Sequence, residues 1–141
     1  MKSNITRTRV EPKPADSEKI TINLGFVDLG QIDLLVAERF YANRSDFIRT
    51  AIRNQLGTHS EAVKQVVARK TLVLGLQHFS ADDLRAVKAA KQRLQIRVLG
   101  LATIANDVSP ERALATIASL DVRGALHASP AVKAALAGRQ R

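Results

Sequence analysis

The segment Lys-Ile-Thr-Ile-Asn-Leu, residues 19–24, alternates polar and apolar side chains. A period of two places Lys19, Thr21 and Asn23 on one face of a β-strand and the three aliphatic side chains on the other. Gly25 ends the run. The pattern therefore predicts a half-buried strand with a polar outer face.

Two helical patterns follow this strand. The first runs from about residue 27 to residue 42, with apolar side chains at helical spacing. The second begins at Asn43, where Asn-Arg-Ser-Asp supplies an N-cap and, three residues on, an acid that can cap back to it. Gly57 is the expected end of the second helix.

The predicted strand needs a partner. A single strand leaves its edges and its apolar face unsatisfied, and no second strand is predicted within the first 58 residues. The simplest partner is the same strand of another copy, which gives an antiparallel two-stranded ribbon around a two-fold axis. The residues alone therefore favour a homodimer.

The order strand–helix–helix closely resembles the ribbon-helix-helix family of Arc-, MetJ- and CopG-type repressors. The resemblance rests on Lys-Ile-Thr-Ile-Asn-Leu, on Ile-Asp-Leu-Leu-Val-Ala, and on Asn-Arg-Ser-Asp-Phe-Ile-Arg-Thr-Ala-Ile-Arg. It is expected to cover only the N-terminal third of the chain. It implies a sequence-specific DNA-binding transcriptional regulator that places its ribbon in the major groove of double-stranded DNA.

The family's base-contacting positions are the outward side chains of the strand, which are here Lys19, Thr21 and Asn23. Lysine can donate to guanine O6 and N7, asparagine can bond adenine N6 and N7, and threonine offers a hydroxyl and a methyl group. The alternative is that these side chains form only the solvated face of a half-buried strand.

The family also anchors phosphate at the N-terminus of its second helix, where backbone N–H groups and the helix dipole favour anions. The matching residues are Asn43, Arg44 and Ser45. Because Asp46 lies close by, the anchor is assigned to backbone N–H groups and to the Ser45 hydroxyl. A plain helix cap is a compatible interpretation.

The second half of the chain contains an internal repeat. Gly75, Gly100 and Gly124 are spaced 25 and 24 residues apart, and each lies in an apolar run that leads to a serine and a helical segment. Ser80 and Asp83 form a capping-box pattern at the first of these helices. Units of this length predict parallel strands stacked side by side, as in leucine-rich-repeat-like solenoids, with a compact βα layer as the alternative.

The predicted fold class is α+β: a dimeric ribbon-helix-helix followed by a small βα-repeat domain. A basic N-terminal arm precedes them, in which Arg7 and Arg9 are candidates for accessory DNA contacts or belong to a tail without defined contacts. The predicted parts are a flexible arm (1–17), the ribbon-helix-helix (18–58), a connecting helix (59–70) and three βα repeats (71–141).

The net charge is +9, which favours a polyanionic partner. Residues 60–141 hold 13 of the 22 basic side chains and 6 of the 13 acidic ones, so most of the excess lies outside the predicted DNA-reading part.

Composition excludes several classes of site. The absence of cysteine rules out disulfides and thiolate metal sites, suits a reducing compartment and, with no apolar run long enough for a membrane span, favours the cytoplasm. The three histidines are scattered, so no metal site is expected. No cofactor motif and no catalytic constellation is found, and an enzyme is not expected.

The leading hypothesis is therefore a homodimeric transcriptional regulator, in particular a repressor, that is able to form higher oligomers on DNA. A second is an antitoxin of a toxin–antitoxin pair, with the C-terminal half binding a protein partner. A third is a plasmid-maintenance or structural DNA-binding protein whose repeats drive assembly along DNA.

Overall fold

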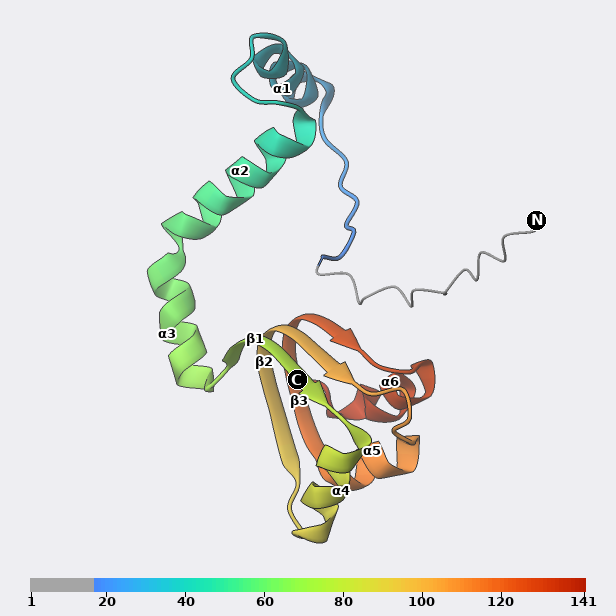
Figure 1. Ribbon diagram of the computed structural model, residues 1–141. Helices are drawn as coiled ribbons and strands as arrows, with labels where there is room; N and C mark the ends of the chain where they lie inside the picture. Colours follow the sequence, from blue (N-terminus) through green and yellow to red (C-terminus); the bar gives the residue numbers. More distant parts are fainter. Residues whose placement is uncertain (1–16) are drawn as a thin grey trace, which may run out of the picture. The chain divides into compact units, whose positions relative to one another are not determined.

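The computed structural model describes residues 17–141, and Figure 1 shows its course. Helices and strands are mixed, which confirms the α+β prediction. The chain divides into two compact units, the first ending at Arg44 and the second running from Ser45 to Arg141. The predicted accessory contacts Arg7 and Arg9 lie outside the described residues.

The first unit contains helix α1, Phe26–Ala37. It ends earlier than the predicted residue 42, because a turn closes behind it. The Arg39 and Phe40 N–H groups donate to the carbonyls of Val36 and Leu35, while Arg39 takes a left-handed φ of 65°. This is the hydrogen-bond pattern of a Schellman C-cap, with arginine where glycine is usual.

The predicted strand over residues 19–24 forms no ladder within the described part of the chain, where these residues carry no regular secondary structure. A strand is defined by hydrogen bonds to a neighbour, and the predicted neighbour is a second copy. The ribbon therefore stays a prediction.

The second unit begins with two helices in near-continuous succession. Helix α2 spans Arg44–Thr58 and helix α3 spans Ser60–Lys70, with His59 between them. The prediction that α2 ends at Gly57 is wrong, because Gly57 has no positive φ and stays within the helix. A glycine can end a helix by adopting the left-handed region, but it is not obliged to do so.

Three parallel strands in the order β1-β2-β3 follow, each leading into a helix. In chain order the elements are β1 (Val73–Phe79), α4 (Ala81–Ala89), β2 (Leu94–Ile104), α5 (Pro110–Thr116), β3 (Ile117–His127), α6 (Pro130–Leu136) and the short 3-10 helix η1 (Ala137–Arg139).

Serine caps start the three helices that alternate with the strands. The Ser80, Ser109 and Ser129 hydroxyls each accept a hydrogen bond from the backbone N–H three residues on. The predicted capping box is confirmed, because the Ser80 N–H also donates to the Asp83 carboxylate at 2.9 Å. Such a cap satisfies N–H groups that the first turn of a helix leaves without a helical partner.

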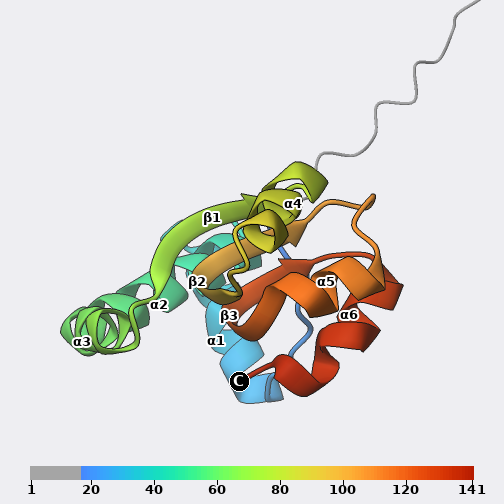
Figure 2. The same ribbon diagram turned by 90° about the horizontal axis from the view of Figure 1, so that it is seen from below.

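The core lies between one face of the sheet and helices α4, α5 and α6, which gather on that face in Figures 1 and 2. The even-numbered side chains of β2 point into it, and Val98 and Ala102 are fully buried there. Leu84 of α4 and Val132 of α6 close over them without any exposed surface. The buried hydrophobic side chains of this core are all aliphatic, as expected from a chain with so few aromatic residues, and the partly buried Phe79 packs against them.

Three glycines form a ladder across the sheet. Gly75 pairs with Gly100, and Gly100 pairs with Gly124. Gly100 has a φ of 140° and Gly124 one of 117°, which side chains rarely adopt. A Cβ at Gly100 would overlap the Gly75 carbonyl oxygen, and one at Gly124 would overlap that of Gly100. The glycine spacing of the sequence therefore reflects a conformation that the strands share.

The two edges of the sheet differ. Beside β3, Gln140 forms a bridge with Leu120, and the Arg141 N–H donates to the Leu120 carbonyl at 2.8 Å. The Arg139 guanidinium holds this C-terminal segment through the Leu114 and Ile117 carbonyls. Among the strands that the structure describes, β1 pairs only with β2, so its other edge is open.

The ladder predicts that Gly100→Ala destabilises the second unit by at least about 3 kcal/mol, because strain at positive φ adds to a clash with backbone that cannot move aside. Chemical denaturation followed by circular dichroism measures the change. The matched control is Gly57→Ala in α2, where a Cβ meets nothing within 4 Å. It should stabilise the protein by about 0.5–1 kcal/mol. Equal effects of the two substitutions would contradict the ladder.

Candidate nucleic-acid interface

The predicted base-contacting side chains, Lys19, Thr21 and Asn23, are all exposed in the segment before α1. The intervening apolar side chains are exposed as well, with Ile20 at 75% and Ile22 at 60%. In the single chain, the segment therefore has an exposed polar set and an exposed apolar set. The alternation makes these two sets the two faces of a strand once a partner strand is present.

The rest of the first unit also leaves apolar surface uncovered. Ile32 is the one buried side chain among its described residues, 17–44. Phe26 is 93% exposed and Phe40 is 73% exposed. Exposed apolar side chains of this size are typical of surfaces that take part in an interaction, so this stretch is an interface candidate. The first unit thus carries a nucleic-acid-facing candidate and an interface candidate in one short stretch.

The predicted phosphate-contacting residues lie at the start of α2. Arg44 and Ser45 are its first two residues, Asn43 immediately precedes them, and Asp46 stands in the first turn. The positive end of a helix dipole and the N–H groups of a first turn make such a helix start suited to phosphate oxygens.

Arg44 has an intramolecular partner that the sequence patterns did not reveal. Its Nε and Nη2 donate to the two carboxylate oxygens of Asp33 at 2.7 and 2.8 Å. This bidentate pair joins α1 to the residue that begins α2. The only signal in the sequence is that Asp33, of opposite charge, lies eleven residues before Arg44. The sequence does not predict the geometry of the turn between them.

The pair also sets the charge state of both groups. The hydrogen bond from Arg44 lowers the pKa of Asp33, and the same bond raises the pKa of Arg44. Both are charged at neutral pH, so the Arg44 cation is balanced by a carboxylate within the unit. Arg44 is therefore a weaker phosphate ligand than its position alone suggests, and Ser45 with the backbone N–H groups is left as the stronger candidate.

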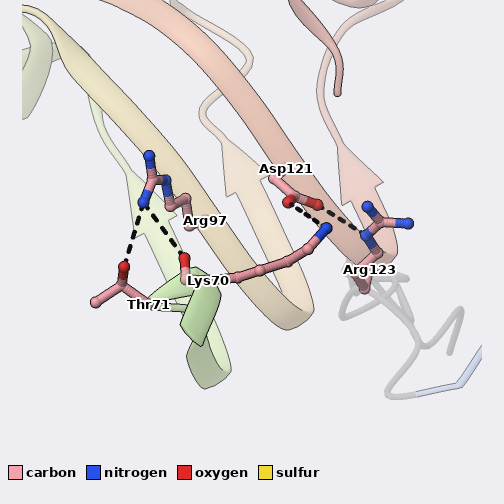
Figure 3. A network of polar contacts seen from close by, with 5 residues as sticks. All are labelled: Lys70, Thr71, Arg97, Asp121 and Arg123. Carbon is pink, nitrogen blue, oxygen red and sulfur yellow. Dashed lines mark hydrogen bonds and ion pairs between the residues drawn. The ribbon is translucent and has the colours of Figure 1, made fainter. Parts of the chain in front are cut away.

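A second set of charges lies on the outer face of the sheet, opposite α4–α6 (Figure 3). The Arg97 guanidinium donates to the Lys70 carbonyl at 3.3 Å and to the Thr71 hydroxyl at 3.2 Å. Asp121 accepts from Arg123 at 2.8 Å and lies 3.8 Å from the Lys70 ammonium. These contacts fasten the end of α3 to strands β2 and β3, so part of the positive charge of residues 60–141 serves the fold.

Other classes of site find no support in the part of the chain that the structure describes. Residues 17–141 contain no group of three or more His, Asp or Glu side chains that could hold a metal ion. His78 hydrogen-bonds the Thr103 hydroxyl, and His127 is the cross-strand neighbour of Thr103 on its other side. None of the described helices is long and apolar enough to cross a membrane.

The Asp33–Arg44 pair predicts a pH-dependent contribution to the stability of the first unit. Because folding lowers the pKa of Asp33 from its ordinary 3.8, the stabilisation is complete well above pH 4 and is lost as pH falls through the lowered pKa. Asp33→Asn should therefore lower the thermal midpoint slightly at pH 7, and the gap from the unmodified protein should narrow at an acid pH below 3.8, as Asp33 becomes protonated. Differential scanning calorimetry at both pH values checks this. A gap that persists at low pH would assign the effect to packing instead of charge.

The chain matches the ribbon-helix-helix transcriptional regulator family over residues 15–133. No curated protein sequence and no solved structure matches it. The match extends far beyond the N-terminal third and includes β1, β2 and β3, so the prediction that the resemblance is confined to residues before 59 is wrong. Over most of its length, the chain belongs to the ribbon-helix-helix transcriptional regulator family.

Proposed function

We propose that the protein is a homodimeric repressor that reads a short, near-palindromic operator through a ribbon formed by residues 19–24 of two chains. Family membership makes DNA-binding regulation of transcription the function class. The observation that carries the finer proposal is the alternation of residues 19–24 together with the exposure of every side chain in that segment.

Dimerisation resolves the energetic problem of this segment. Burying an aliphatic side chain of this size contributes about 1.5–3 kcal/mol. Ile20, Ile22 and Leu24 of both chains would be covered at once, and the backbone groups of each strand would find partners in the other. A two-fold ribbon also presents the polar faces of both chains on one side, as a palindromic operator requires.

Base recognition is assigned to Lys19, Thr21 and Asn23 on that polar side. Lysine and asparagine supply the donor and acceptor patterns that distinguish guanine and adenine in the major groove. The backbone N–H groups at the start of α2, with Asn43 and the Ser45 hydroxyl, then fix the register by binding phosphate. Affinity should fall steeply as salt rises, because each neutralised phosphate releases counterions.

The antitoxin hypothesis receives less support. Antitoxin segments that bind a toxin are typically short and disordered when free, and they fold on binding. Residues 73–136 instead form a sheet covered by three capped helices around a buried core. The plasmid-maintenance hypothesis differs from repression in the arrangement of operators, and the same ribbon would serve both.

The experiment that tests the proposed function is selection of genomic DNA fragments by the purified protein, followed by footprinting of the enriched sites. Expected are protected half-sites related by two-fold symmetry, with neighbouring genes whose transcription rises when the protein is removed. Enrichment without a shared sequence would refute specific recognition. Long arrays of repeated sites without an effect on transcription would favour the structural role.

Replacing Lys19, Thr21 and Asn23 together with alanine should reduce operator binding at least 100-fold, to the level of unrelated DNA, because the base contacts are lost. The measurement is a fluorescence titration with operator and with scrambled DNA at one fixed salt concentration. Lys64→Ala is the matched control, since it removes the same single positive charge from an exposed position of α3. Operator preference that survives in the triple variant would show that the ribbon is not the reading element.

A further inference from the structure

The open edge and the outer face of the sheet form a second surface without an assigned partner. We propose that β1 pairs with β1 of a second copy of this chain, antiparallel and about a two-fold axis, so that the two sheets become one. This contact is separate from the ribbon and belongs to the second unit.

The first observation is the exposed apolar face of the sheet. Leu74 is 74% exposed and Leu76 is 66% exposed, and both lie on β1. Their cross-strand neighbours on β2 are Leu99 and Leu101. Parallel sheets are normally covered on both faces, and here α4, α5 and α6 cover only one of them.

Helix α3 covers part of this outer face and leaves the β1 side open. An apolar cavity of about 380 Å³ lies between α3 and the sheet, lined by Val63, Val66, Leu72 and Leu99 among others. Leu74 and Leu76 are not among the residues that line it. The part of the outer face nearest the open edge is thus the part that α3 leaves to another molecule.

The second observation is the chemistry of the edge itself. Strand β1, Val73–Phe79, contains no charged residue and no proline. Exposed edge strands are usually protected by lysine, by proline or by a local bulge. The positive φ of Gly75 offers no such protection, because its partners Gly100 and Gly124 also have a positive φ and the three strands stay in register there.

The third observation selects a second copy as the occupant. Strand β1 carries no charged side chain, so pairing two copies of this chain there brings no like charges together at the seam, although each chain has a net charge of +9. Antiparallel pairing of β1 with itself is self-complementary, because the same backbone groups serve both copies.

The fourth observation is that the opposite edge is partly occupied. Gln140 and Arg141 already bond Leu120 of β3, so the first part of that edge is taken by the chain's own C-terminal residues, whereas no described strand pairs with the free edge of β1. Head-to-tail addition would build an open filament, whereas β1-to-β1 pairing ends after two copies. The sheet therefore favours a closed pair.

The test uses full-length variants in which the two contacts are broken separately. Ile20→Lys with Ile22→Lys, the ribbon variant, removes the first contact, in a segment without regular secondary structure in the single chain. Leu74→Lys with Leu76→Lys, the edge substitutions, place charges on exposed positions of β1. The matched control adds the same two charges on exposed positions of α4, Ala86→Lys and Ala89→Lys.

Sedimentation equilibrium gives the masses. The ribbon variant is expected to remain a dimer through β1, and to become a monomer when the edge substitutions are added. With the α4 control substitutions it should stay a dimer. In the ribbon variant, the milder substitutions Leu74→Thr and Leu76→Thr, which are compatible with a strand, should raise the dissociation constant of the β1 dimer at least tenfold. A monomeric ribbon variant with native circular dichroism would overturn the proposal, as would a dimer that persists after the edge substitutions.

Measuring operator binding distinguishes a failure of β1 pairing from a failure of the proposed DNA recognition. The edge substitutions leave residues 19–24 and the start of α2 unchanged, so binding to one isolated operator should stay within about threefold of the unmodified protein. Failure of β1 pairing with intact operator binding would refute only the second contact. Operator binding by the triple alanine variant tests only the role of the ribbon and says nothing about β1 pairing.

Discussion

Apolar surface that one chain cannot bury is the constraint on which this protein depends. In the first unit, Ile32 is the one buried side chain among the described residues, while Ile20, Ile22 and Phe26 face solvent. In the second unit, the helices cover one face of the sheet and leave Leu74 and Leu76 outside. Both surfaces would cost stability and solubility in an isolated chain. The proposed self-association would cover apolar surface in both units, and at the ribbon it would place Lys19, Thr21 and Asn23 of two chains in a symmetric pair.

The glycine ladder explains why the parallel strands of the second unit could be predicted from the sequence. The 25- and 24-residue spacing of Gly75, Gly100 and Gly124 predicted strands side by side, and the structure pairs these residues directly. The serine caps were equally legible, because a cap is a local interaction between residues three apart. Both the serine caps and the glycine spacing produce sequence patterns that can be recognised without knowledge of the rest of the fold.

Other features could not be predicted, because they depend on contacts that are not local. The end of α1 at Ala37 rests on a left-handed arginine, Arg39, where the expected marker is glycine. Helix α2 passes through Gly57 and ends one residue later at Thr58, so this glycine does not act as a left-handed cap. The Asp33–Arg44 pair reassigns a side chain that the family pattern gave to phosphate. In the candidate site, Lys19, Thr21 and Asn23 are exposed and their role stays a prediction, whereas Arg44 has a partner that the sequence did not predict.

The positive charge of the chain is distributed unevenly, and part of it is used in contacts within the fold. Most of the excess positive charge lies in residues 60–141, yet Arg97, Arg123 and Arg139 are held by carbonyls, a hydroxyl or Asp121 within the fold. A positive net charge raises the rate of encounter with DNA over the whole molecule. In the proposed function, sequence specificity would come instead from the exposed polar side chains of residues 19–24.

The two proposed contacts have different roles. The ribbon would bring two DNA-reading segments together, and a strand pair at β1 would join two second units. Each is a symmetric contact that closes on itself. Because β1 pairing would leave residues 19–24 and the start of α2 unchanged, affinity for one isolated operator would depend on the ribbon and not on the sheet. The family match includes the residues of both contacts.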